Sequence, residues 1–339
     1  TILIQMQKPD ATYLAGYKTW ETLERHVKKG ERGIMILAPN PHKCVKEVEV
    51  FDPQTGKQKV DADGNLVGES KTAEVPANLG ENKSSIDMSI ERLRDFDYLL
   101  SNFYTVDSST MIGPEQLNAD DLRGRSRKID RKQKGPKILI FHTHSQEEFA
   151  DSIPGDPSTS IVGIGDYLTE LLNQKGIETI HDKGVYDIIN GQLDRSNAYE
   201  YAEAGVRPIL EANPTIEVAI DLHRDGVAEG THLVTEVNGK PTAKIMYFNG
   251  LRRTRAKGDI TYLPNPYIQD NLAFSLQMEL ASERMFPGFA RHIYLRAYRY
   301  NLHLLPKSLL IEAGAQTNTV QEMKNAMEVL AETLCQVIG

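Results

Sequence analysis

Cysteine is nearly absent from this sequence: Cys44 and Cys335 are the only two among 339 residues. Two cysteines close to opposite ends of the chain cannot build a disulfide framework, and they lack the spacing of a cysteine-based zinc site. We therefore expect both to be structural. Their scarcity also leaves the redox compartment of the protein undetermined.

Long apolar runs and an excess of positive charge are missing too. No stretch approaches the ~20 apolar residues that span a bilayer, and the first residues lack the charged-then-apolar layout of a signal peptide. The sequence begins at Thr1 rather than Met, as expected for a fragment that has lost an export signal or anchor. A net charge of −8 excludes a general attraction of the whole chain to nucleic acid or anionic lipid.

Several catalytic motifs are absent as well. The sequence has no Gly-x-Ser-x-Gly nucleophile elbow, no phosphate-binding Gly-x-x-x-x-Gly-Lys and no Gly-x-Gly-x-x-Gly after a predicted strand. Neither cysteine has neighbours that would activate it as a nucleophile. These absences leave metal-dependent hydrolysis as the chemistry to test against the residues that are present.

Length and composition predict a globular protein of two domains. The chain exceeds the usual size of a single hydrophobic core, and 40% hydrophobic with 25% charged residues is typical of globular proteins. A polar stretch over 66–90 predicts a linker, and apolar residues at helical spacing over 91–105 predict a helix. We expect an N-terminal domain over 1–80, a linker and helical lead-in over 81–135, and a main domain over 136–339.

Strands and helices alternate along the main domain. This alternation is typical of an α/β fold with a twisted, mostly parallel sheet covered by helices on both faces, here beside a small separate α+β N-terminal domain. The predicted elements are strands over 138–141, 177–180, 216–220, 293–300 and 309–311, helices over 161–175, 196–212 and 270–285 (the last capped by Asp270), a hairpin over 232–248 turning at Asn238-Gly239, and a final helix opening with a capping box of Thr319 and Glu322.

Three of the predicted strands end in residues suited to metal-dependent hydrolysis. Functional groups of α/β sheets gather beyond the carboxyl ends of the strands. One strand is followed by 142–148 (HTHSQEE), another runs into 221–225 (DLHRD), and a third runs into 312–314 (EAG). A single histidine at a strand end is usually structural, so it is the coincidence of three such clusters that favours a site.

The residue types in these clusters match a zinc hydrolase. Such enzymes use about three His, Asp or Glu ligands and leave one position for water, whose pKa the metal lowers. His144 and Glu147 have the His-x-x-Glu spacing with which one turn offers two ligands, and His223 would supply the third from another strand. Glu312, which follows an apolar run, is the expected general base and acid.

Some residues of the clusters stay ambiguous. Alternation along a strand would place His142 and His144 on the same face, so His142 could replace His144 as a ligand or orient it. Arg224 and Asp225 could bind substrate or form a structural ion pair. No role is assigned to four other histidines, which are His181, His232, His292 and His303.

The clusters and the sequence between them resemble the stage II sporulation protein P family of endospore-forming bacteria, over about residues 86–339. The motifs that carry the resemblance are Leu100-Ser101-Asn102-Phe103-Tyr104, the His142 to Glu147 block, Asp221 to Gly226, Asn271-Leu272-Ala273-Phe274 and Glu312 to Thr319.

The resemblance implies the fold of zinc amidases, a twisted sheet between helices. It also implies an N-acetylmuramoyl-L-alanine amidase, which cuts the amide between the lactyl group of the glycan and the first L-alanine of the stem peptide. The ligand pattern of the family falls on His144 (or His142), Glu147 and His223, with Zn2+ as the cofactor and Glu312 as the catalytic residue.

The same resemblance implies where the protein acts and with what. Peptidoglycan would be the substrate, and stage II sporulation proteins D and M would be the partners during engulfment of the forespore. The location would be extracytoplasmic, in the cell wall or the forespore intermembrane space. Family members are normally held by an N-terminal membrane anchor, which is absent from this chain.

The first 80 residues resemble a different family. Lys18, Trp20, Lys28 and Lys29 place cations beside an aromatic ring, which suits base stacking combined with phosphate contacts. Composition alone instead favours Trp20 in a core and the lysines in a solvated turn. The segments 7–12 (QKPDAT), 15–20 (AGYKTW) and 27–31 (VKKGE) are similar to the N-terminal single-stranded-DNA-binding domain of antirestriction protein C and its relatives on mobile elements.

Two further functions stand as alternatives to the amidase. One is a single-stranded-DNA-binding protein of a mobile element with an inactive hydrolase-like domain; salt-sensitive DNA binding by residues 1–80, with no bound metal elsewhere, would identify it. The other keeps the metal and changes the substrate, because His-x-x-Glu spacing also occurs in metallocarboxypeptidases. Release of C-terminal amino acids from peptides would identify that case.

Overall fold

The computed structural model describes residues 47–49, 68–70 and 84–339. The chain divides into two compact units, 1–80 and 81–339. In the first unit the described residues form the antiparallel pair β1–β2. The residues predicted to bind DNA lie outside the described residues; they are Lys18, Trp20, Lys28 and Lys29.

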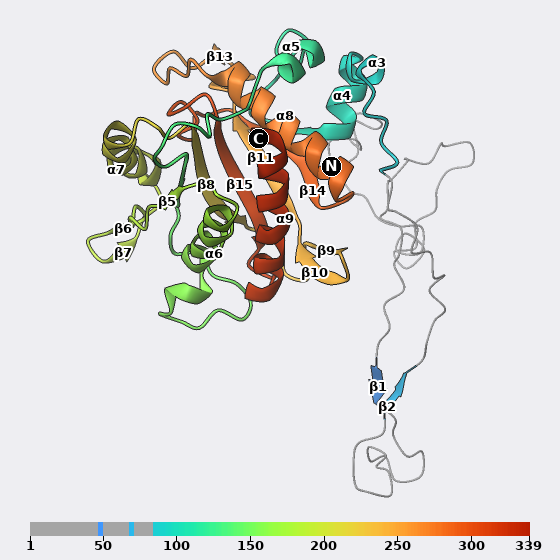
Figure 1. The fold of residues 1–339 in the computed structure, drawn as a ribbon, viewed down its shortest axis with the longest axis vertical. Helices are drawn as coiled ribbons and strands as arrows, with labels where there is room; N and C mark the ends of the chain where they lie inside the picture. The colour runs from blue at the N-terminus through green and yellow to red at the C-terminus, as the bar shows by residue number, and fades with distance from the viewer. Residues whose placement is uncertain (1–46, 50–67, 71–83) are drawn as a thin grey trace, which may run out of the picture. The chain divides into compact units, whose positions relative to one another are not determined.

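The helices and strands follow one another along the chain as Figure 1 shows. They are β1 (Glu47–Glu49), β2 (Gly68–Ser70), α3 (Ile90–Leu93), α4 (Phe96–Phe103), β3 (Tyr104–Val106), α5 (Ala119–Gly124), β4 (Ile138–Phe141), the 3-10 helix η1 (Pro157–Thr159), α6 (Ile161–Gln174), β5 (Thr179–His181), β6 (Ile188–Ile189), β7 (Gln192–Leu193), α7 (Ala198–Ala212), β8 (Val218–Asp225), β9 (Val234–Val237), β10 (Lys240–Ala243), β11 (Ile245–Gly250), β12 (Arg253–Thr254), β13 (Gly258–Asp259), α8 (Ile268–Met285), β14 (Ala290–Arg296), β15 (Ser308–Ala315) and α9 (Val320–Ile338).

A seven-stranded sheet forms the centre of the second unit, in the order β3-β14-β11-β15-β8-β4-β5. Five of its six neighbouring pairs are parallel, and the pair β11–β15 is antiparallel. The prediction of a mostly parallel α/β sheet is thereby confirmed for this unit. Because β15, β8 and β4 are consecutive and run in the same direction, their carboxyl ends meet at one edge of the sheet.

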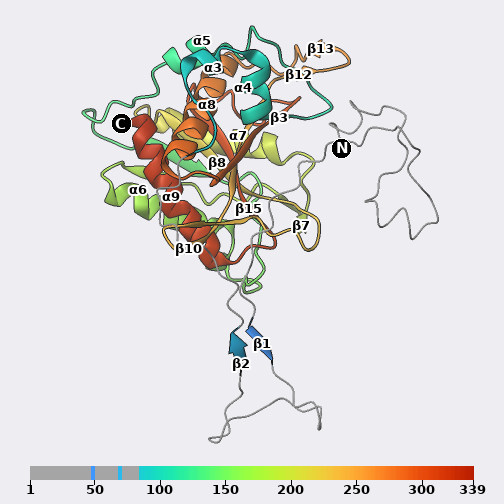
Figure 2. The same ribbon diagram turned by 90° about the vertical axis from the view of Figure 1, so that its right-hand side faces the viewer.

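Helices cover both faces of the sheet. Leu222 and Ile311 belong to the larger core, which lies between the sheet and α6, α8 and α9. Phe141 faces the other way and packs with Val206 of α7, as period-two alternation along the strands requires. The two views of the ribbon agree in placing α6 and α9 side by side on one face (Figures 1 and 2).

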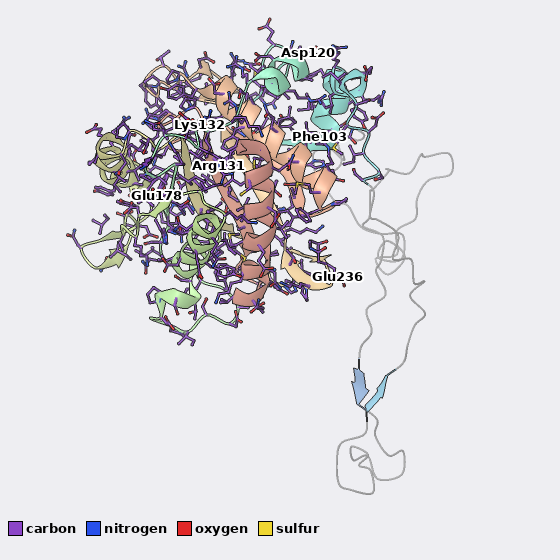
Figure 3. The ribbon with its side chains drawn as sticks, viewed as in Figure 1. Phe103, Asp120, Arg131, Lys132, Glu178 and Glu236 are labelled. Atoms are coloured by element: carbon purple, nitrogen blue, oxygen red, sulfur yellow. The ribbon has the colours of Figure 1, made fainter. Side chains whose placement is uncertain are left out.

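The segment expected as a linker and helical lead-in contributes an edge strand. β3 pairs in parallel with β14 and extends the sheet by one strand. Phe103, at the end of α4, is buried, whereas Asp120 on α5 and Glu236 on β9 are exposed at the margins of the unit (Figure 3). Within the described residues, no helix combines the length and apolarity needed to cross a bilayer.

Two local predictions are confirmed by the backbone. β9 and β10 form an antiparallel hairpin, and Asn238 and Gly239 supply positive φ angles of 53° and 75° at its turn. The hairpin is shorter than the predicted 232–248, because 245–248 belong to β11, which pairs with β14 and β15 in the central sheet. At the start of α9, the Thr319 hydroxyl accepts from the Glu322 amide, and the Glu322 carboxylate accepts from the Thr319 amide.

The predicted cap of the preceding helix is wrong. α8 begins at Ile268 after Tyr267, whose side chain makes no capping bond. Asp270 lies in the first turn and pairs with Arg125 at 3.2 Å and Arg127 at 3.1 Å. A carboxylate in the first turn is favourable beside the helix dipole just as it is at the cap, so the sequence did not distinguish the two positions.

Candidate active site

Four side chains that the sequence singled out converge at the carboxyl edge of the sheet. His144 and Glu147 come from the loop that follows β4, His223 lies in β8, and Glu312 lies in β15. β8 is the strand between β4 and β15. The sheet order therefore brings together residues that are up to 168 positions apart in the sequence.

His144, Glu147 and His223 form a compact group of possible metal ligands. One ligand atom from each lies within 4.8 Å of the other two. Glu147 is central, with Oε1 3.7 Å from His144 Nδ1 and Oε2 3.7 Å from His223 Nδ1. Glu147 and His223 are almost wholly buried, whereas the side chain of His144 is 17% exposed, so the group is reached from the His144 side.

A second carboxylate orients His223. Asp221 Oδ1 lies 2.8 Å from His223 Nε2, and the two groups form a buried ion pair when the imidazole is protonated. Asp221 also accepts from the Thr143 amide and hydroxyl, at 2.9 and 2.6 Å. This arrangement leaves His223 Nδ1 facing Glu147, as a ligand held by an outer carboxylate would be.

The pKa of each group follows from burial and from its neighbours. Burial disfavours the charged form of His223, but Asp221, Glu147 and Glu312 outweigh it and raise the pKa to about 10. Burial lowers the pKa of His144 to about 3, and the neighbouring His223 adds to this effect. Burial also raises the pKa of Glu147. The site thus holds several carboxylates and imidazoles out of water, and their mutual interactions together with burial set each pKa.

Cationic and amide groups surround Glu147. Its Oε2 accepts from the Arg224 backbone amide at 2.9 Å, and Arg195 Nη2 lies 3.7 Å from Oε1. The Arg224 guanidinium reaches back to the Glu148 carbonyl at 3.1 Å. Arg224 therefore positions the loop after β4 through its main chain and its side chain together.

Glu312 faces the group from the neighbouring strand. It is the register partner of His223 across the parallel pair β15–β8, so the two side chains project from the same face of the sheet. Oε2 of Glu312 is buried without a hydrogen-bond partner, and burial raises the pKa of this carboxyl to about 8. The ladder is irregular after Glu312, where Gly314 adopts φ +56°; such bulges often lie beside active sites.

His142 does not join this group. Its Nδ1 donates to the Leu222 carbonyl at 2.7 Å, so in the neutral ring Nε2 accepts from His181 Nε2, 2.8 Å away. Burial and the nearby His181 lower its pKa to about 3, which keeps the ring neutral. The expectation that His142 and His144 share a face is wrong, because β4 ends at Phe141 and strand alternation does not continue beyond it.

The His142–His181 pair lies against α6. Asp166 Oδ1 is 2.9 Å from His181 Nδ1, and Lys183 binds the same carboxylate. A Cβ atom on Gly165 would lie 2.6 Å from the Nε2 atoms of both histidines. The helix therefore needs glycine at this position to admit the two rings.

The side chains of Asp225 and Arg224 have different partners. The Asp225 carboxylate pairs with Arg291 of β14 at 2.7 Å, whereas Arg224 contacts the loop after β4 as described. The two side chains do not form an ion pair with each other, and binding of substrate by either one stays a prediction. Two of the histidines without an assigned role lie beside carboxylates, His232 at 2.8 Å from Glu322 and His303 at 3.0 Å from Glu203.

Three neighbours of the site were not identified from the sequence. Asp221 carried a usable signal, because two residues along a strand share a face and it precedes His223 by two. His181 and Tyr199 carried none, since only packing over long sequence distances brings them to His142 and His144. The ring of Tyr199 meets that of His144 edge-on, with centroids 5.6 Å apart.

The donor set fits a zinc ion. Two ligands of tetrahedral zinc at about 2.1 Å from the metal lie about 3.4 Å from each other. The two 3.7 Å separations run to different oxygens of Glu147, and the ligand atoms of the three residues lie within 4.8 Å of one another, so the group must close by up to about 1.4 Å to hold the metal. Two imidazoles and one carboxylate are ligand types that zinc prefers in hydrolases. Asp221 and Arg224 already hold two of the three ligands in place.

Comparison with known sequences gives one family and one curated relative. The sequence model of the family "Stage II sporulation protein P (SpoIIP)" matches residues 26–335. Stage II sporulation protein P of Bacillus subtilis (strain 168) is 20% identical over 254 residues, which cover 68% of this chain and 60% of that protein. The chain therefore spans less than two thirds of the length of this relative.

Comparison with solved structures gives weaker similarities. The CwlD amidase from Clostridioides difficile, solved with the GerS lipoprotein, is 16% identical with a TM-score of 0.35, over 59% of this chain and 99% of that one. An N-acetylmuramoyl-L-alanine amidase from Clostridium difficile 630 is 14% identical with a TM-score of 0.36, over 60% and 95%. Likeness at this level does not assign an activity.

Proposed function

The chain belongs to the stage II sporulation protein P family, and on that basis we propose that it is a zinc-dependent N-acetylmuramoyl-L-alanine amidase. It hydrolyses the amide between the glycan and the stem peptide of peptidoglycan during endospore engulfment. One observation carries the proposal: His144, Glu147 and His223 form a three-ligand group, and the buried carboxyl of Glu312 faces it from the next strand.

The ligand group would hold the metal through two imidazole nitrogens and one carboxylate. Zinc bound there would supply Lewis acidity for the amide carbonyl and for a water nucleophile. Asp221 holds the His223 ring in orientation, and the Arg224 amide holds Glu147. Since His144 is the exposed ligand, substrate approaches along its side of the group.

Glu312 carries the proton transfers. As general base it receives a proton from the attacking water, and as general acid it returns that proton to the departing amine of L-alanine. Burial raises its pKa to about 8, which makes the carboxylate a stronger base and lets it hold the proton until the C–N bond breaks. A carboxyl with the usual pKa of an exposed glutamate would do so less well.

Membership of the family supports a proposal for the setting. The protein acts outside the cytoplasm, in the cell wall or the forespore intermembrane space, with stage II sporulation proteins D and M as partners. The residues predicted to bind DNA lie outside the described residues, so that role stays a prediction.

Digestion of purified peptidoglycan tests the activity. The proposal predicts release of peptides with a new N-terminal L-alanine, loss of this release in a chelator, and its recovery on addition of zinc. Undiminished release in the chelator would exclude the metal mechanism. Release of C-terminal amino acids instead would identify a carboxypeptidase.

A further inference from the structure

A row of aromatic side chains leads from the ligand group to the surface. His144 contacts Tyr199 at a centroid distance of 5.6 Å, Tyr199 contacts Tyr300 at 5.3 Å, and Tyr300 contacts Tyr298 at 6.4 Å, all edge-on. Tyr199 is partly buried, whereas Tyr298 is 53% exposed at the outer end. The row connects the proposed catalytic centre to solvent through rings alone.

A pocket of about 190 Å³ lies along this row. It extends between the start of α7 and the segment 298–301. Its aromatic lining comes from Tyr199, Tyr298 and Tyr300, and its polar lining includes Ser196, Glu200 and Asn301. The pocket therefore combines ring faces with hydrogen-bonding groups, which is the usual makeup of a small-molecule subsite.

The one cation that lines the pocket is neutralised. Arg299 Nη2 lies 2.7 Å from Glu203 Oε2, and Glu203 also binds Arg207 and His303. Glu200 adds an exposed carboxylate to the lining. The two guanidinium groups of Arg299 and Arg207 balance the two carboxylates of Glu203 and Glu200, so the pocket lining offers no unpaired cation to an anionic group such as a carboxylate of the stem peptide. This balance favours a neutral, hydroxyl-rich ligand.

The segment 298–301, which forms one side of the pocket, has a strained backbone. Tyr300 and Asn301 both adopt the left-handed region, at φ 50° and 55°, which is a rare conformation for a bulky residue such as tyrosine. Gly250 makes room for it, because a Cβ atom there would collide with the Tyr298 carbonyl and the Tyr300 ring. Strain of this kind persists where the surrounding structure holds it, often at ligand sites.

We propose that this pocket is the subsite for a pyranose ring of the glycan strand, next to the scissile amide. The inference rests on the proposed amidase function. It places the glycan on the Tyr298 side of the ligand group, and so orients the substrate in the site. The apolar face of the sugar ring stacks on Tyr298, and its hydroxyl and acetamido groups bond to the polar lining. Because the amide is attached to the sugar by the short lactyl arm, the sugar must lie close to the metal group, and Tyr199 forms part of both sites.

Binding of a peptide-free disaccharide tests the subsite without turnover. The probe is N,N′-diacetylchitobiose, a neutral disaccharide of N-acetylglucosamine, titrated calorimetrically into the whole protein. We expect Tyr298→Ala to weaken binding about tenfold, since an aromatic contact of this kind is lost, and Tyr298→Phe to retain most of it. The control is Tyr201→Ala, which removes an exposed tyrosine of α7 that does not line the pocket. This variant should bind the disaccharide like the wild type.

Kinetics on peptidoglycan fragments supply the second measurement. With disaccharide-peptide as substrate, Tyr298→Ala should act mainly on KM rather than on kcat, because Tyr298 touches the sugar and not the reacting atoms. Equal disaccharide affinity in wild type and Tyr298→Ala would overturn the inference, as would binding of a sugar-free stem peptide that Tyr298→Ala abolishes. If disaccharide binding depends on Tyr298 but no amide is cleaved, the subsite stands and the amidase function fails.

Discussion

Glu312 and His223 are register partners on the adjacent parallel strands β15 and β8, and both side chains project from the α7 face of the sheet. The proposed proton carrier and one proposed ligand are therefore fixed relative to each other by the main-chain ladder. His144 and Glu147, in contrast, come from a loop, which Asp221 and Arg224 tie to β8. The rigid strand pair and the tied loop together define the site.

Replacing Glu312 should abolish turnover while the metal stays bound. Glu312→Gln removes the group that accepts and returns the proton, so we expect kcat to fall about 10²- to 10⁴-fold. Zinc content should remain that of the wild type, because Glu312 is not one of the grouped ligands. Muropeptide release and zinc analysis of the same preparation measure both; an active Glu312→Gln variant would exclude this role.

The same substitution should stabilise the metal-free protein at alkaline pH. The folded-state pKa of Glu312 is about 8, above the value near 4.5 expected for the unfolded chain. Below pH 4.5 the group is protonated in both states. Between pH 4.5 and 8 the unfolded chain releases this proton while the folded protein keeps it. The free energy of unfolding therefore falls by about 1.4 kcal/mol per pH unit in this range.

Urea unfolding with chelator at pH 4.5 and pH 8 measures this difference. Glu312→Gln should be more stable than the wild type by a few kcal/mol at pH 8 and by little at pH 4.5. Glu148→Gln, which removes an exposed carboxyl near the site, should show no such pH-dependent gain. A constant difference between Glu312→Gln and wild type at both pH values would contradict the buried, proton-holding carboxyl.

Asp221 should set the affinity for zinc without being a ligand. Asp221→Asn leaves the three ligands intact but removes the charge that orients His223, so we expect the dissociation constant for zinc to rise about 10- to 100-fold. Asp225→Asn is the matched control, because Asp225 lies on the same strand and pairs with Arg291 instead. Competition with a chromogenic chelator measures both; unchanged affinity in Asp221→Asn would remove the orienting role.

Gly165 should be intolerant of a methyl group. Gly165→Ala would place Cβ 2.6 Å from both His142 and His181, and we expect a loss of about 1–3 kcal/mol although alanine favours helices by up to ~1 kcal/mol. Gly124→Ala, at the end of α5, meets no atom within 4 Å and should be neutral or stabilising. If both variants unfold at the same urea concentration, the close approach of the two rings to α6 is refuted.

Much of the site could be predicted because its residues follow apolar strands in recognisable clusters. His-x-x-Glu spacing pointed to His144 and Glu147, and alternation of strands and helices pointed to the sheet edge where His223 and Glu312 meet them. The order of strands in the sheet was not predictable in detail, since the antiparallel pairing of β11 with β15 depends on contacts distant in the sequence.

The direction of side chains in the loops around the site could not be predicted from the sequence. His142 and His144 diverge because β4 ends one residue before His142, and strand ends are set by tertiary contacts rather than by propensity. The pairing of His142 with His181, and the space that Gly165 provides for it, join three segments that are distant in the sequence. The aromatic row from His144 to Tyr298 likewise exists only after α7 packs on the sheet.

Zinc content, measured together with muropeptide digestion, tests the central claim most directly. The account predicts about one zinc per chain in the wild type, and loss of both the metal and the release of L-alanine-terminated peptides in His223→Ala. Circular dichroism of His223→Ala checks that the variant is folded. A wild type that binds no zinc and cleaves no peptidoglycan, or a His223→Ala variant that keeps both, would contradict the account.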